Sequence, residues 1–175
     1  MGDRLAAGEG SLGIAPEAVR PSTAEVKSGT MDPITIQIDI DRPPADVYAY
    51  ATDPTHFPDW QKDVAAATVS GAPGAPGSTF TTIRHFAGSS QTMTQEVTES
   101  DPPSRWSSRG ISGAVKASGA LRLEPLDDGS RTRVTFSITF ESGLLGRAII
   151  PLVVRQTRAG APKSFQRLKE ILERS

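Results

Sequence analysis

Hydrophobic and polar residues alternate strictly where the patterned part of the chain begins. Every second residue from Ile34 to Ile40 is isoleucine and the residues between are polar, which is the period of a β-strand with one buried face. Pro43 and Pro44 end this strand and suit the first turn of a helix, where an N–H has no partner. The sequence therefore predicts a strand, a helix, and a short second helix that ends at Trp60.

Strand-like segments follow Trp60, and turn-forming Gly, Pro and Asp residues separate them. The predicted strands are 64–70, 77–86, 90–98, 105–111, 115–126 and 132–141. The last is the clearest, because hydrophobic residues from Val134 to Phe140 alternate with Arg, Thr and Ser. Each strand is expected to bury one face and expose the other.

The tail from Leu144 to Leu172 returns to helical spacing. Pro162, helped by Gly160, is expected to break the helix near residues 158–161, because proline removes a backbone donor and clashes with the preceding turn. We therefore predict a long C-terminal helix in two pieces.

Composition narrows the class of protein. Residues 1–31 lack aromatic side chains and sustained periodicity, so we predict a disordered extension followed by a single domain over 32–175. The net charge of −1 argues against nucleic-acid binding, and the absence of cysteine excludes disulfides and thiol chemistry. No apolar run approaches the roughly 20 residues that span a bilayer. We expect a cytoplasmic protein without a metal or cofactor.

Four motifs in order resemble a known superfamily. They are the strand and helix start at 38–48, Phe57-Pro58-Asp59-Trp60, the strand end at 96–103, and Gly129-Ser130-Arg131-Thr132-Arg133-Val134. The chain from Ile34 to Glu173 resembles the SRPBCC superfamily, the START-like, birch-pollen-allergen-like proteins. Within it, the chain is most similar to the bacterial polyketide cyclase/dehydrase and lipid-transport family.

The resemblance implies an α+β helix-grip fold. About seven antiparallel strands would form a curved sheet around the long C-terminal helix, with two short helices after the first strand and a ligand cavity between sheet and helix. Superfamily members include lipid carriers, aromatase/cyclases, quinone-binding proteins and chaperone activators, so the fold does not choose among these functions.

Strand and helix parity then predicts which residues face the cavity. For any one of them ordinary core is the more frequent role, and only the architecture favours a lining role for the group. The predicted lining is Trp60, Phe80, Arg84, Phe86, Met93, Trp106, Ala117, Gly119, Leu121, Phe136, Phe140, Ile149 and Val153. Arg84 and His85 are adjacent in one strand and must lie on opposite faces. We expect Arg84 to face the ligand and His85 to face solvent. The alternative for Arg84 is an ion pair with a surface acid.

Catalytic residues are harder to find in this sequence. It has no HExxH, P-loop or Ser-His-Asp arrangement, and Arg84, Arg109 and Tyr48 are the candidate polar groups for polarising a substrate. The sequence favours binding and carriage or sequestration of a small hydrophobic ligand of the lipid, polyketide or quinone type. The alternatives are a polyketide aromatase/cyclase or dehydratase, and a protein-interaction module or peripheral membrane binder. The basic C-terminal helix permits membrane contact, but we favour its packing on the sheet. The oligomeric state is left open.

Overall fold

The computed structural model describes residues 32–86, 88–143 and 146–175. Its seven strands form one antiparallel sheet in the order β1-β7-β6-β5-β4-β3-β2. The strands are β1 (Ile34–Ile40), β2 (Val64–Ser70), β3 (Thr79–Phe86), β4 (Ser89–Asp101), β5 (Arg105–Ser112), β6 (Val115–Leu126) and β7 (Arg131–Ser142). The helices are α1 (Pro44–Ala51), α2 (Phe57–Trp60) and α3 (Ile150–Arg174), with short 3-10 turns at Pro54–His56 and Asp127–Gly129. The predicted extension 1–31 lies outside the described residues.

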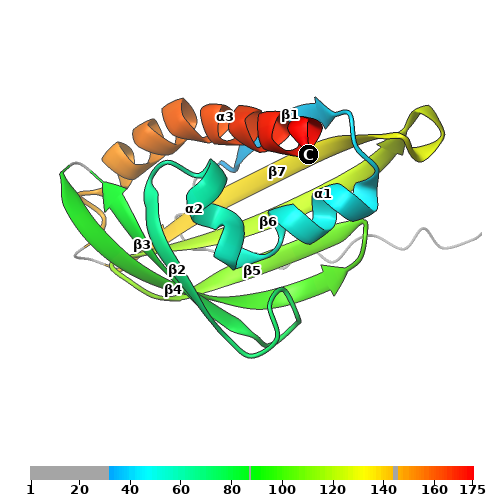
Figure 1. Cartoon of the computed structure of the whole chain (residues 1–175). Helices are drawn as coiled ribbons and strands as arrows, with labels where there is room; N and C mark the ends of the chain where they lie inside the picture. The colour runs from blue at the N-terminus through cyan, green and yellow to red at the C-terminus, as the bar shows by residue number, and fades with distance from the viewer. Residues whose placement is uncertain (1–31, 87, 144–145) are drawn as a thin grey trace, which may run out of the picture.

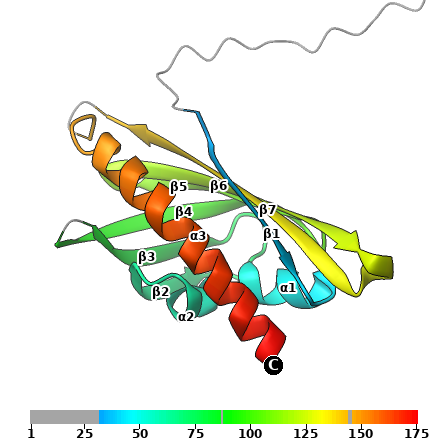
Figure 2. The ribbon, with the colours of Figure 1, turned by 90° about the horizontal axis from the view of Figure 1, so that it is seen from above.

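The long helix α3 lies diagonally across the concave face of the curved sheet, and α1 and α2 close one side of the space between them (Figures 1 and 2). This is the predicted helix-grip architecture. The strand order follows from the chain path, because β1 pairs with β7 at one edge while β2 to β7 pair consecutively. Within the described residues, no helix is both long and apolar enough to cross a membrane.

Buried side chains form two clusters between the helices and the sheet. The larger gathers around Ile40, Val134 and Leu168, which are completely buried. The smaller lies under the first turns of α3 and includes Phe140 and Val153. Residues from both clusters line a cavity between the sheet and α3.

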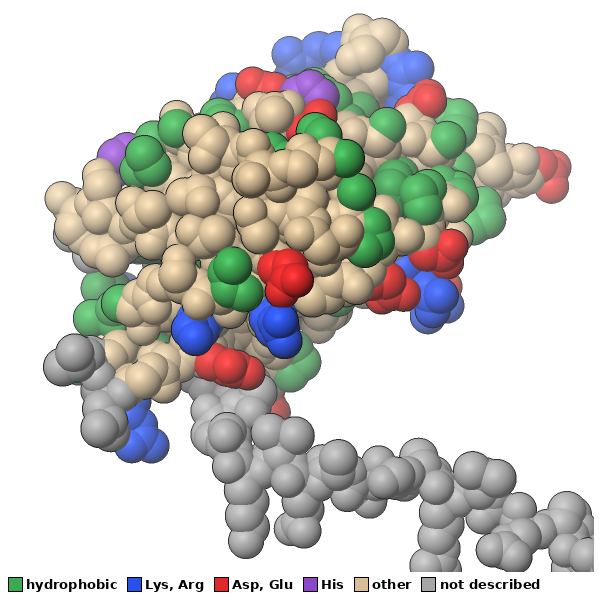
Figure 3. Space-filling model, turned by 90° about the horizontal axis from the view of Figure 1, so that it is seen from below, with side chains coloured by type: hydrophobic (Ala, Val, Ile, Leu, Met, Phe, Trp, Pro, Cys, Tyr) green, Lys and Arg blue, Asp and Glu red, His purple; other side chains and the backbone are tan. Residues whose placement is uncertain are grey.

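The outer face of the sheet is polar, as strand parity predicts. Thr81 hydrogen-bonds Thr94 on the neighbouring strand at 2.9 Å, and Thr98 hydrogen-bonds Ser107 at 2.9 Å. Viewed from below, polar uncharged side chains and backbone dominate the centre of this face (Figure 3). Ile83, 39% exposed, is an exception to that polarity.

The prediction of a two-piece C-terminal helix is wrong, because α3 runs without interruption through Pro162. Pro162 is exposed, so its ring faces away from the sheet side of the helix. Val153 and Val154 are buried before it, and Phe165 and Leu168 are buried after it. Packing on both sides of the proline therefore holds the helix together despite one missing hydrogen bond.

We expect Pro162→Ala to stabilise the protein. Proline in a helix interior costs about 3 kcal/mol relative to alanine, and restricting the unfolded chain returns part of that cost. The free energy of unfolding should therefore rise by about 1–3 kcal/mol, measured by urea denaturation. The adjacent exposed Lys163, changed to alanine, is the control and should shift it by less than about 0.5 kcal/mol. No gain for Pro162→Ala would contradict the prediction.

Candidate functional site

A cavity of about 230 Å³ lies between the concave face of the sheet and α3. This volume is just below the range of about 300–1,000 Å³ typical of pockets for drug-sized ligands. The side chains deep in the cavity are mostly aromatic and aliphatic. They are Phe57, Trp60, Phe80, Met93, Trp106, Ala117, Leu121, Phe136, Ile138, Phe140 and Phe165.

Aromatic rings from α2, α3 and the sheet form a connected wall in the cavity lining. The ring of Trp60 packs edge-on against Phe165 with centroids 5.2 Å apart, which joins α2 to α3. The ring centroid of Phe136 on β7 lies 5.1 Å from that of Phe165. The ring centroid of Phe80 lies 5.6 Å from that of Phe57 and 6.0 Å from that of Trp106. Such contacts fix ring orientations, so the wall is preformed.

The free volume arises where strand register aligns small residues. Gly119 of β6 stands opposite Ser108 of β5 and Ile138 of β7, and Ala117 stands opposite Phe140. Because side chains alternate along a strand, Ala117 and Gly119 face the same side as the large residues around them. The missing side-chain volume at these two positions leaves space under α3.

Polar groups gather at the mouth of the cavity. Gln61, Lys62 and Asp63 follow α2, and Arg84 near the end of β3 donates to Asp63 Oδ2 and to Gln61 Oε1, both at 2.7 Å. The Arg84 side chain is 16% exposed. Both interpretations of Arg84 therefore apply in part: it lines the cavity, and an acid at the mouth neutralises it. His85 is exposed on the other face.

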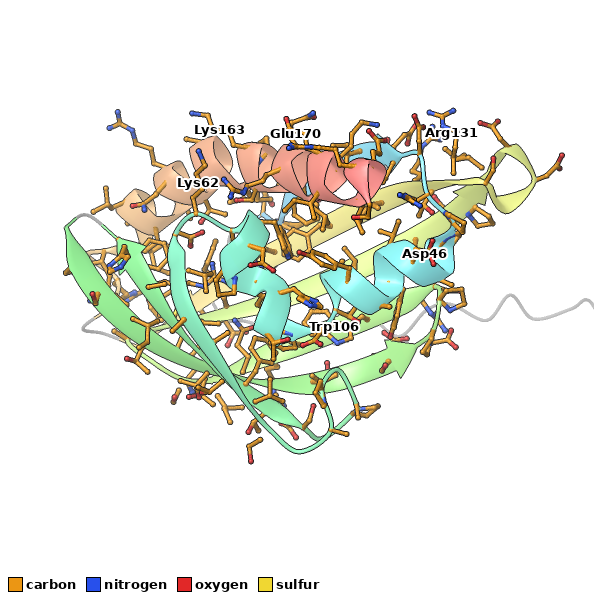
Figure 4. The ribbon with its side chains drawn as sticks, in the orientation of Figure 1. Asp46, Lys62, Trp106, Arg131, Lys163 and Glu170 are labelled. Carbon is orange, nitrogen blue, oxygen red and sulfur yellow. The ribbon has the colours of Figure 1, made fainter. Side chains whose placement is uncertain are left out.

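Two lysines add uncompensated charge to the mouth. Lys62 and Lys163 both line the cavity and are exposed, and neither forms an ion pair with a residue that the structure describes. Figure 4 shows them on the same side of the molecule, where the chain leaving α2 approaches α3. With the Arg84–Asp63 pair neutral, the mouth carries net positive charge and suits a negatively charged group.

The deep part of the cavity contains one polar pair. Ser108 Oγ donates to Gln95 Oε1 at 2.8 Å, and both residues are buried. Two tryptophan N–H groups are also buried nearby in the lining, those of Trp60 and Trp106, and neither has a hydrogen-bond partner within the described chain. Trp106 lies between the sheet and the short helices (Figure 4).

The prediction that Ile149 and Val153 line the cavity is wrong. Ile149 is the N-cap of α3 and is 38% exposed, and Val153 is 5% exposed and packs in the smaller core cluster. Ile149 is directed to solvent, and Val153 packs directly against side chains of the sheet, so neither residue lines the cavity. All the other predicted cavity residues line the cavity.

The face of α3 that does line the cavity was missed by the sequence reasoning. It consists of Gln156, Thr157, Gly160, Ala161, Ser164 and Phe165. Small and polar residues recur there at i, i+4 and i+8, which is the signal that could have identified a helix face set against a void.

The three candidate catalytic residues do not converge. Arg109 is on the outer face, where its 64% exposed side chain pairs with Glu96 at 3.0 Å. The Tyr48 hydroxyl is hydrogen-bonded to Ser100 Oγ at 2.7 Å. Burial raises the pKa of Tyr48. Neither residue lines the cavity that Arg84 lines. In the described ranges, no group of three or more His, Asp or Glu side chains is placed to hold a metal ion.

The curved sheet, the long helix across it and the cavity between them define a protein with the helix-grip fold. The chain belongs to the polyketide cyclase / dehydrase and lipid transport family, whose family model matches residues 31–173. A search of the curated proteins found no match.

Solved structures share the fold at low sequence identity. A protein from Thermus thermophilus is 20% identical with a TM-score of 0.68, and the match covers 81% of this chain and 97% of that one. The Zhui aromatase/cyclase from a Streptomyces species is 16% identical, with a TM-score of 0.67 over 82% and 94% of the two chains. A START superfamily protein from Mycobacterium smegmatis is 12% identical, with a TM-score of 0.68 over 83% and 99%. These similarities establish the fold alone.

Proposed function

We propose that this protein binds a small hydrophobic or amphipathic molecule, of the lipid, polyketide or quinone type, and carries or sequesters it unchanged. The observation that carries the proposal is the preformed aromatic cavity of about 230 Å³ under α3. Apolar surface transferred from water into such a space is stabilised by about 25 cal/mol per Å². The lysines at the mouth favour a ligand whose outer end is acidic.

The second candidate is a polyketide aromatase/cyclase or dehydratase, and the structural similarity to the Zhui aromatase/cyclase favours it. Such chemistry needs a proton donor or acceptor within hydrogen-bond reach of the substrate. The titratable side chains among the described lining residues are Lys62, Asp63, Arg84 and Lys163, all at the mouth. Carriage therefore needs fewer assumptions than catalysis. If turnover of a polyketide were found and Arg84→Ala left it intact, Arg84 would have no part in it.

Native mass spectrometry of gently purified protein tests the proposal directly. We expect a bound species of defined mass, which denaturing extraction then identifies. The chain has two tryptophans, and because both line the cavity, their emission should change when ligand enters. Protein that carries no ligand, and whose emission stays constant on titration with fatty acids, naphthoquinones and aromatic polyketides, would contradict the proposed function.

A further inference from the structure

Gln95 and Ser108 are the uncharged polar side chains that strands β4 and β5 contribute to the described lining of the cavity. They come from neighbouring strands, β4 and β5, and they are only 7% and 4% exposed. Their neighbours in the wall are apolar or aromatic, including Phe80, Trp106 and Leu121. A polar pair in such surroundings must satisfy its hydrogen-bonding groups locally or through a ligand.

The hydrogen bond between Gln95 and Ser108 does not use all the donors of the pair. Ser108 Oγ donates to Gln95 Oε1 at 2.8 Å, so the Gln95 Nε2 group keeps two N–H donors, and no described residue accepts from them. If the amide were turned by 180°, one Nε2 hydrogen would be donated to Ser108 Oγ, and the second Nε2 hydrogen and the hydroxyl hydrogen would be the spare donors. In either orientation the pair offers a donor in the wall of the cavity.

The indole N–H groups of Trp60 and Trp106 are also buried without a partner among the described residues, but their nitrogen atoms have almost no accessible surface and do not open into the free space. The spare donor of the sheet wall is therefore the one that Gln95 and Ser108 supply. The charged side chains of the described lining, Lys62, Asp63, Arg84 and Lys163, lie at the mouth, so none of them lies beside Gln95 to neutralise a buried anion. A hydrocarbon would leave the amide unpaired, and a carboxylate would be buried without a counter-charge.

We propose that the Gln95–Ser108 pair is the polar anchor of the cavity and donates a hydrogen bond to a neutral carbonyl oxygen of the ligand. This inference rests on the proposed function, and it restricts the ligand to ketones, quinones and esters among the hydrophobic molecules of suitable size. Gln95 selects the ligand in this arrangement, while the aromatic wall supplies most of the affinity.

The test compares 2-acetylnaphthalene with 2-isopropylnaphthalene, which has nearly the same shape but no carbonyl group, by isothermal titration calorimetry. The ratio of their dissociation constants is measured in the wild type and in Gln95→Met, so the difference in ligand hydration cancels. We expect the preference for the ketone to fall by about tenfold in the variant, the size of one net hydrogen bond. Methyl 2-naphthoate, measured in parallel, tells whether the anchor also accepts esters.

A second measurement uses the wild-type protein and so does not depend on folding of the variant. The infrared carbonyl band of ¹³C-labelled 2-acetylnaphthalene should shift to lower frequency on binding, relative to its position in hexane. A band at the hexane position, or an unchanged binding ratio in Gln95→Met, would overturn the anchor while leaving cavity binding intact. Failure of both naphthalenes to bind the wild type would overturn the anchor, because the cavity would then not admit an aromatic ketone, while the proposed function is decided separately by native mass spectrometry and the emission titration.

Discussion

Replacing Gly119 with valine is expected to weaken ligand binding at least tenfold. A Cβ atom added at Gly119 would lie 3.3 Å from the ring of Phe136, which is tighter than an ordinary contact. Phe136 lines the cavity, so the added side chain would force its ring out of its contact with Phe165 and into the free space. The valine methyl groups and the displaced ring would then occupy volume that the ligand needs. A loss of about 1.4 kcal/mol of binding free energy corresponds to tenfold.

Ala120→Val is the matched control for this change. Ala120 is the next residue of β6, but it is exposed and lies on the outer face of the sheet. Both variants introduce the same β-branched side chain into β6, one on the cavity face and one on the outer face. Calorimetric titration with 2-acetylnaphthalene would show binding unchanged in Ala120→Val. Equal affinities for the two variants would place the ligand outside the cavity.

The sequence contained enough information for the sheet and its inner face because side-chain direction in a strand depends only on parity. Thr82 is completely buried and Ile83 is 39% exposed, as the alternation of β3 requires. The same rule correctly oriented Arg84 inward and His85 outward. Turn-forming residues between the strands placed most strand ends within about two residues, but β4 continues to Asp101, three residues beyond its predicted end.

Parity alone could not predict how far each inner-facing residue is from free space. That distance depends on the angle at which α3 crosses the sheet, which is set by packing along the whole helix. Val153 faces the sheet and is buried, because at that point the helix packs directly on the side chains of the sheet. The open volume lies further along α3, beside Gly160 and Ala161.

The charged groups were the least predictable part of the candidate site. Arg84 and Asp63 are 21 residues apart in the sequence, and their contact requires the register in which Arg84 of β3 pairs with Val64 of β2. Arg109 showed no pattern that would place it beside Glu96, its partner across the β4–β5 ladder. Ion pairs of this kind become visible only once the strand register is known.

Leu168→Ala is expected to cause the largest loss of stability. Leu168 is completely buried in the larger core cluster, together with Ile40 and Val134, where α3 crosses the sheet. Truncating a buried leucine removes transfer free energy and leaves a cavity, at a cost of about 2–5 kcal/mol. For a chain of this size the melting temperature should fall by about 2–4 °C for each kcal/mol lost. Urea denaturation followed by circular dichroism measures the loss in the free energy of unfolding, and a thermal scan measures the fall in melting temperature.

The effect should be large because the same part of α3 is also fastened by polar contacts that depend on its position. Lys169 Nζ donates to the Asp39 carbonyl at 2.7 Å, and the Asp41 N–H donates to Glu173 Oε1 at 2.8 Å. The exposed Gln166, changed to alanine, is the control and should alter the free energy of unfolding by less than about 0.5 kcal/mol. A loss below about 1 kcal/mol in Leu168→Ala, measured in the same way, would mean that the polar contacts rather than the core hold α3 over the cavity.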